Sequence, residues 1–154
     1  MALTKILRDS LYHVAESVAS LSTCDRKHVG AIIVDDDGNV LASGFNCPPR
    51  ADSHVRQGTP CSSWCQRSIS GAVDTQYGLR CPSVHAEINA LIHLSTHSCR
   101  KTMLVTYHPC EDCAKAIVAA GIECVVMPTQ RAAHQTDVTP YFLRCGCKVE
   151  YYDG

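Results

Sequence analysis

Two short motifs, far apart in the sequence, have to meet in the folded chain. The first runs from His85 to Glu87 and the second from Pro109 to Cys113, and each lies where a predicted helix begins. Cys110 and Cys113 are one helical turn apart on the same face, so both thiolates can reach one metal ion. A nitrogen of His85, from the neighbouring helix, can supply the third ligand.

Three protein ligands favour a catalytic zinc site over a structural one. A structural zinc usually has four protein ligands, whereas three leave a position for a water whose pKa falls to about 7. Glu87 is two residues from His85 and is predicted to act on this water as a proton shuttle, without binding the metal. A His-x-Glu motif followed by Pro-Cys-x-x-Cys is the general signature of zinc-dependent nucleobase deaminases.

Each motif residue also has a plainer explanation when taken alone. Cys110 and Cys113 could form a redox pair or be two buried thiols, His85 a core histidine, and Glu87 an exposed helix carboxylate. A structural zinc would need a fourth ligand nearby, for which His108 is the candidate. The occurrence of both motifs in one chain favours the catalytic interpretation.

Hydrophobic periodicity predicts an α/β fold in which helices pack on a sheet. Helices are expected up to about Leu21 and at Ala86–Leu94, Cys110–Ala120 and Val138–Arg144; strands are expected at Val29–Val34, Val40–Phe45, Met103–Tyr107, Cys124–Met127 and Lys148–Tyr152. Residues 46–84 lack periodicity and are predicted to be a cysteine-rich loop inserted into a single domain, 1–154.

The composition argues against a nucleic acid or a membrane as partner. Fourteen Lys and Arg against 15 Asp and Glu give a formal net charge of -1, which leaves little excess for a basic face. The sequence has no recognisable export signal and no apolar run of membrane-spanning length. Eleven cysteines in such a chain are best explained by metal binding and reduced thiols, so we expect a cytoplasmic protein.

The sequence resembles the deoxycytidylate (dCMP) deaminase family of the cytidine deaminase superfamily over most of its length. The similar blocks are Thr23–Arg26 leading into Val29–Val34, Gly44–Asn46, His85–Ile92 and Val105–Val126. The resemblance implies a three-layer αβα sandwich with a five-stranded mixed sheet, and a homo-oligomer, often a hexamer. The implied reaction is hydrolytic deamination of dCMP to dUMP by a zinc-activated water, with Glu87 as the proton shuttle.

The resemblance also suggests substrate-binding residues. Asn46 is carried over from the family as a nucleotide contact, Arg26 is a candidate cation for the phosphate, and Ala86 and His108 are further candidates. Taken alone, Asn46 could be a turn residue after a strand and Arg26 a solvated surface charge. Family members usually have a glycine after this asparagine, whereas Cys47 and two prolines follow here, so allosteric control by dCTP or dTTP stays open.

A second, structural zinc found in many relatives would explain the cysteine-rich loop. Its plausible ligands are Cys24, Cys61, Cys65 and Cys81, with Cys47 or His54 as possible replacements. The alternative is a flexible insertion with unpaired thiols. The remaining cysteines, Cys99, Cys124, Cys145 and Cys147, are interpreted as small hydrophobes or incidental thiols.

Three alternative functions remain at this stage. The substrate could be a modified or triphosphate nucleotide: 5-methyl-dCMP, 5-hydroxymethyl-dCMP or dCTP. A nucleic-acid deaminase shares the zinc chemistry but needs a basic, often aromatic channel, and only 6% of the residues are aromatic. A non-catalytic zinc module that binds a partner through the cysteine-rich loop would leave Glu87 unexplained.

Overall fold

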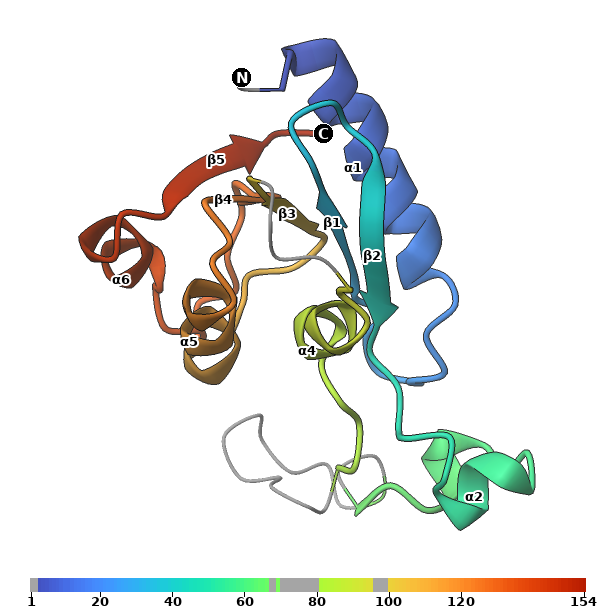
Figure 1. Cartoon of the computed structure of the whole chain (residues 1–154). Helices are drawn as coiled ribbons and strands as arrows, with labels where there is room; N and C mark the ends of the chain where they lie inside the picture. Colours follow the sequence, from blue (N-terminus) through green and yellow to red (C-terminus); the bar gives the residue numbers. More distant parts are fainter. Residues whose placement is uncertain (1–2, 67–68, 70–80, 96–99) are drawn as a thin grey trace.

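A five-stranded mixed sheet forms the centre of the protein. The computed structural model describes residues 3–66, 69, 81–95 and 100–154. The strands are β1 (Gly30–Val34), β2 (Val40–Phe45), β3 (Thr102–Val105), β4 (Cys124–Pro128) and β5 (Lys148–Tyr152), arranged in the order β2-β1-β3-β4-β5 (Figure 1). β1 is antiparallel to both β2 and β3, whereas β3, β4 and β5 are parallel. The predicted mixed sheet is confirmed.

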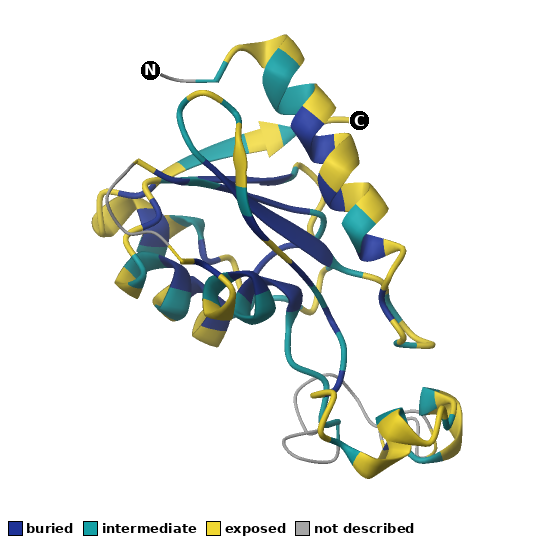
Figure 2. Cartoon of the chain, turned by 45° about the vertical axis from the view of Figure 1, so that its right-hand side comes forward, coloured by how far each residue is buried: buried dark blue, intermediate teal, exposed yellow. Residues whose placement is uncertain are grey.

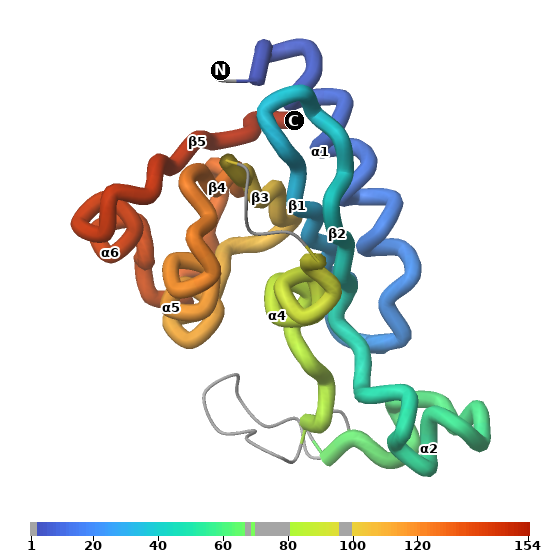
Figure 3. Tube along the Cα trace, in the orientation of Figure 1, coloured from blue at the N-terminus to red at the C-terminus, as the bar shows by residue number. Residues whose placement is uncertain are grey.

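Helices cover both faces of this sheet, which confirms the three-layer arrangement. Helix α1 (Lys5–Ala19) lies on one face, and α4 (Ala86–Ile92), α5 (Glu111–Ala119) and α6 (Thr139–Arg144) lie on the other (Figures 1 and 3). Among the described residues, no helix has the length and apolar character needed to cross a membrane.

The strand residues alternate between two hydrophobic clusters, one on each face of the sheet. Ile32 and Val34 of β1 pack with Leu11 of α1, whereas Ile33 of β1 packs in the larger cluster that contains Phe142 of α6. All five residues of β1 are buried, and the centre of the sheet forms a continuous buried band (Figure 2). A β-branched apolar run buried on both faces is typical of a central strand.

The helix and strand ends differ slightly from the predicted ones. Helix α1 ends at Ala19, two residues before the predicted end at Leu21. The sequence predicts a buried helix face that runs to about Leu21, but the side chain of Leu21 is 59% exposed in this chain. Strand β3 ends at Val105, two residues before the predicted Tyr107. Helix α5 begins at Glu111 because Cys110 is its N-cap, with an extended backbone and a sulfur that accepts a hydrogen bond from the Cys113 amide.

The described part of the predicted 46–84 loop contains short helical segments, two of which have both ends described. These are α2 (Ser53–Arg56), which Asp52 caps through the His54 amide at 2.9 Å, and the 3₁₀ turn η1 (Cys61–Ser63). The rings of His54 and Trp64 stack with centroids 4.6 Å apart. Such short segments cannot show helical periodicity, so the prediction of an irregular loop was wrong at these positions. Residues 67–68 and 70–80 lie outside the described residues.

Gly44 allows helix α4 to lie directly on strand β2. A Cβ atom at this position would come within 2.3 Å of the Ala90 nitrogen and 2.4 Å of the Ala86 oxygen, both backbone atoms of α4 or its first turn. No side chain can be accommodated there unless the two backbones separate. Gly44 therefore sets the position of the first turn of α4, which carries His85 and Glu87.

We expect Gly44→Ala to lower the free energy of unfolding by about 1–3 kcal/mol, because β2 and α4 must move apart to admit the methyl group. Chemical denaturation followed by circular dichroism measures the change. Ser43→Ala, at the neighbouring exposed position of β2, is the matched control and should change the value by less than about 0.5 kcal/mol. Equal unfolding curves for the two variants would contradict this account of the close approach.

Candidate active site

The three predicted metal ligands lie together in the structure. The His85 Nδ1 atom is 3.5 Å from the Cys110 sulfur and 3.3 Å from the Cys113 sulfur. Within the described ranges, these residues form the one group of three or more possible ligands whose donor atoms all lie within 4.8 Å of one another. One imidazole nitrogen and two sulfurs are a donor set that fits zinc.

Two helix starts position this group. His85 is the N-cap of α4, and Val84 before it exchanges two backbone hydrogen bonds with Cys47, at 2.9 and 3.2 Å. Cys110 is the N-cap of α5, at the end of the segment that leaves β3. The partial positive charge of helix N-termini stabilises thiolates, so the location favours metal-binding sulfur.

The two cysteines influence each other's protonation strongly. A hydrogen bond from Cys113 lowers the pKa of Cys110 to about 4, against the opposing effect of burial. The same hydrogen bond, together with burial, raises the pKa of Cys113. Metal ligation requires thiolates, so a bound metal would displace the proton of the Cys113 thiol.

Glu87 lies beside the metal group in a buried position. It is only 4% exposed, and burial raises the pKa of its carboxyl to about 7, although the nearby His85 and a hydrogen bond from Cys113 lower it. A carboxyl group with such a pKa can both take up and release a proton near neutral pH. Glu87 is not part of the His85 group, in keeping with the prediction that it is not a ligand.

Asn46 forms hydrogen bonds that connect the end of β2 to the segment before β1. Its Oδ1 atom accepts a hydrogen bond from the Val29 amide at 2.8 Å, and its Nδ2 atom donates one to the Lys27 carbonyl at 2.8 Å. Its own carbonyl accepts a hydrogen bond from the Ser22 hydroxyl at 2.7 Å. This clamp was not foreseen in the sequence, where only a position directly after a strand hinted at a turn role. Nucleotide contact by Asn46 stays a prediction.

The other candidate substrate residues differ in their surroundings. Arg26 is exposed, and its proposed contact with a phosphate stays a prediction. Ala86, the first residue of α4, is completely buried in the core cluster. Its role likewise stays a prediction.

His108 is buried beside the loop that follows β4. It is 5% exposed, and neither ring nitrogen has a hydrogen-bond partner among the described residues. Burial lowers the pKa of His108, with smaller effects from Pro128 at the end of β4 and from Arg131 and Asp137 of that loop. Its carbonyl accepts a hydrogen bond from Gln135 Nε2 at 3.0 Å. His108 does not join the His85 group, which disfavours a four-ligand structural zinc there.

The predicted ligands of a second zinc come only partly together. Burial chiefly raises the pKa of Cys61 to about 11, and the nearby thiols of Cys65 and Cys24 raise it further. In the part of the chain that the structure describes, these residues and Cys81 do not form a compact ligand group. As for the alternatives, Cys47 accepts a hydrogen bond from Asn89 at 3.7 Å. The second site stays a prediction.

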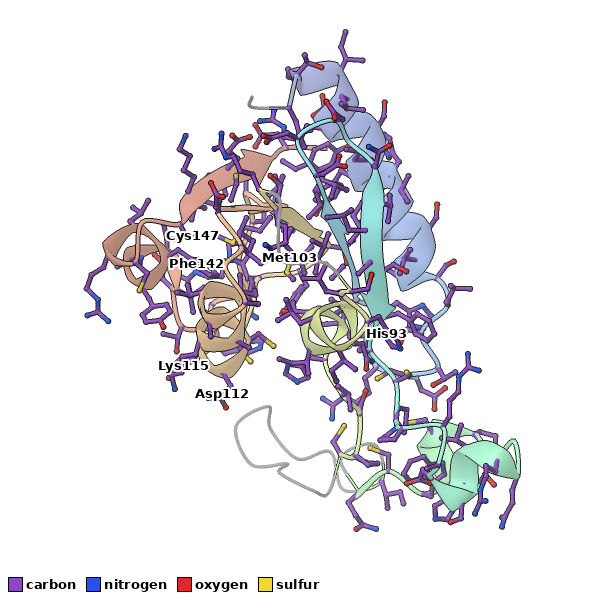
Figure 4. All side chains as sticks on the ribbon, in the orientation of Figure 1. His93, Met103, Asp112, Lys115, Phe142 and Cys147 are labelled. Carbon is purple, nitrogen blue, oxygen red and sulfur yellow. The ribbon has the colours of Figure 1, made fainter. Side chains whose placement is uncertain are left out.

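Among the described residues, the remaining cysteines Cys124, Cys145 and Cys147 do not belong to the metal group. Cys147 is buried near Phe142 in the core beneath α6, and burial raises its pKa to about 11 (Figure 4). Burial also raises the pKa of Cys124 to about 12, whereas Cys145 is exposed. These observations agree with the interpretation of Cys124 and Cys147 as small hydrophobes and Cys145 as an incidental thiol. Cys99 lies outside the described residues.

The outer face of α5 has no part in this group. Asp112 and Lys115 point away from the sheet and form an ion pair of 3.3 Å with each other (Figure 4). Both side chains are well exposed. The possible metal ligands that α5 provides are thus Cys110 and Cys113, at its start.

Comparison with known proteins places these motifs in a described family. Residues 6–129 match the model of the cytidine and deoxycytidylate deaminase zinc-binding region. The deoxycytidylate deaminase of Mycobacterium phage D29 is 38% identical over 123 residues, which cover 76% of this chain and 90% of that protein. The human deoxycytidylate deaminase is 30% identical over 125 residues, covering 80% of this chain and 65% of that protein.

A solved structure agrees with the sequence comparisons. The dCMP deaminase from the cyanophage S-TIM5, in complex with dCMP and dUMP, superposes with a TM-score of 0.75 at 27% identity. The match covers 97% of this chain and 99% of that one. The similarity therefore extends over nearly the whole fold.

Replacing any one ligand of the His85 group should release the metal bound there. We expect His85→Gln, Cys110→Ser and Cys113→Ser each to lower the zinc content by one ion per chain, because two remaining ligands hold zinc weakly. Elemental analysis after gel filtration measures the content. Cys145→Ser, which removes an exposed thiol, is the matched control and should keep the full content. Zinc retention by all three ligand variants would contradict the assignment.

Proposed function

The chain belongs to the cytidine and deoxycytidylate deaminase family, and from this premise we propose that it converts dCMP to dUMP by hydrolytic deamination. The observation that carries the proposal is the His85, Cys110 and Cys113 group with the buried Glu87 carboxyl beside it. The names of the phage and human relatives, and the dCMP and dUMP bound to the cyanophage enzyme, support this nucleotide as the substrate.

In this proposal the metal and the carboxyl group have separate roles. Zinc held by His85, Cys110 and Cys113 would supply Lewis-acid chemistry that makes water a nucleophile at neutral pH. Glu87 takes a proton from the water as its oxygen adds to C4 of the cytosine ring, and gives this proton to N3. Glu87 then moves the second proton from the new C4 hydroxyl to the exocyclic amine. The amine leaves as ammonia, and the C4 carbonyl of dUMP forms.

The surroundings of Glu87 suit this sequence of proton transfers. Burial raises the pKa of the free carboxyl to about 7, which lies near neutral pH. Such a group accepts a proton in the first transfer and returns it in the next with little free-energy cost. The burial that produces this pKa also excludes bulk water from the carboxyl.

Several further properties are proposed on the same family basis. We propose that residues 1–154 form a single domain and that the protein is a homo-oligomer. A second zinc bound by Cys24, Cys61, Cys65 and Cys81 is supported by the influence of the Cys65 and Cys24 thiols on the pKa of Cys61. A total of one zinc ion per chain in the native protein would contradict that second site.

The substrate is tested by incubating the purified zinc-loaded protein with a panel of cytosine compounds. We expect rapid conversion of dCMP that a zinc chelator abolishes, and little activity on a cytosine-bearing single strand. Deoxycytidine, dCTP, 5-methyl-dCMP and 5-hydroxymethyl-dCMP define preference for the phosphate and for the C5 substituent. Deamination of the strand but not of dCMP would contradict the proposal, as would inactivity on every compound.

Glu87→Gln should keep zinc and lose turnover. The amide has nearly the same shape as the carboxyl but cannot transfer protons, so we expect kcat on dCMP to fall by about 10²–10⁴-fold. Steady-state kinetics and elemental analysis of the same preparation give both values. A variant that keeps zinc and most of its activity would show that another group moves the protons.

A further inference from the structure

Lys27 lies beside the chain segment that leads to the metal-binding turn. The backbones of Gly30 and Thr106 are joined by a hydrogen bond of 3.0 Å, and the Gly30 amide also donates to the Thr106 hydroxyl at 3.0 Å. The chain entering β1 therefore runs next to the chain leaving β3. Across this junction, the Lys27 ammonium lies 3.4 Å from the centre of the Tyr107 ring. Three residues after Tyr107 comes Cys110.

The hydrogen bonds of Asn46 also connect Lys27 to the segment that carries His85. Asn46 holds the Lys27 carbonyl through its amide, and the next residue, Cys47, pairs with Val84 immediately before His85. The segments before β1 and after β2 also leave the sheet at the same end (Figure 3). Lys27 is thus linked to the start of α5 through Tyr107, and to the start of α4 through Asn46 and the Cys47–Val84 pairing.

The charge of Lys27 is not matched by a carboxylate. Four other basic side chains, Lys5, Arg8, Arg100 and Lys115, each have a carboxylate partner at 2.6–3.3 Å. Lys27 forms no such ion pair among the described residues and is only half-buried, with the Tyr107 ring against its ammonium. An ammonium carries three donors, and an aromatic face does not use them as hydrogen-bond acceptors would. It can therefore still bind an anion.

We propose that Lys27 binds the phosphate of the nucleotide substrate and makes the site selective for nucleotides over nucleosides. This inference rests on the proposed deamination of dCMP. The ring of Tyr107 is the positioning element, since the Lys27 ammonium lies over its face, 3.4 Å from the ring centre. Asn46 acts in the same way through the backbone of Lys27, which gives this amide a role in substrate recognition that needs no direct contact.

Lys27→Gln tests the proposal when it is compared on two substrates. For dCMP we expect KM to rise by roughly 10–100-fold with kcat little changed, the loss typical of a hydrogen bond to a charged group. For deoxycytidine, which has no phosphate, kcat/KM should not change. Lys27→Arg should recover part of the affinity for dCMP. Lys115→Gln, a lysine on the outer face of α5, is the matched control and should leave both substrates unaffected.

Other outcomes would overturn the assignment. Equal losses on dCMP and deoxycytidine would mean that Lys27 supports the fold and does not select the phosphate. A loss specific to dCMP in Arg26→Gln, with none in Lys27→Gln, would move the role to the neighbouring cation.

Binding measurements separate this proposal from the proposed reaction. Calorimetry with dUMP and deoxyuridine needs no turnover, and Lys27→Gln should weaken only the binding of dUMP. Failure of the wild-type protein to deaminate dCMP would contradict the reaction, while a selective loss of dUMP binding would still support Lys27. Unchanged dUMP binding in Lys27→Gln would overturn the phosphate role whatever the reaction.

Discussion

The contact between His85 and the two cysteine sulfurs is the constraint on which the rest of the structure depends. His85 is held through strand β2, by the Cys47–Val84 pairing and by the close approach of α4 at Gly44. Cys110 and Cys113 are held through β3, which leads into α5. Strand β1 pairs with both β2 and β3, so it fixes the distance between His85 and the two cysteines. The complete burial of β1 gives the site a rigid base.

The same burial determines the chemistry of the titratable groups. Removing a carboxyl from water disfavours its charged form, which is why the pKa of Glu87 rises to about 7 in spite of the nearby imidazole. The Cys110 thiolate, which a hydrogen bond from Cys113 stabilises, raises the pKa of Glu87 further, whereas a hydrogen bond from Cys113 to the Glu87 carboxyl lowers it. Both effects arise from the first turns of α4 and α5, which face each other across the site. The fold thus tunes Glu87 and the thiols through the arrangement of two helix starts.

The sequence predicted the elements whose signals are local. An apolar β-branched run identified the central strand β1, and the spacing of Cys110 and Cys113 identified a ligand pair, because both patterns lie within one strand or one helical turn. The clamp formed by Asn46 depends on how the segment before β1 lies beside β2, and the orientation of His108 depends on the loop after β4. Such relations between distant segments are set by tertiary packing, which hydrophobic periodicity does not contain. The short helical segments α2 and η1 were missed because segments of four and three residues are too short to show helical periodicity.

In the proposed function, the chemistry and the selection of the substrate depend on different parts of this fold. The metal group and Glu87 belong to helix starts that the sheet holds rigidly, whereas Lys27 and Asn46 belong to connecting segments at its edge. The resemblance gave Asn46 a direct contact with the nucleotide, yet its amide already binds the backbone on both sides of His28. In our proposal, this amide acts on the substrate indirectly, by fixing the backbone of the neighbouring cation Lys27. Substrate preference can therefore change through the segment before β1 while the helix starts, and with them the proton transfer, stay the same.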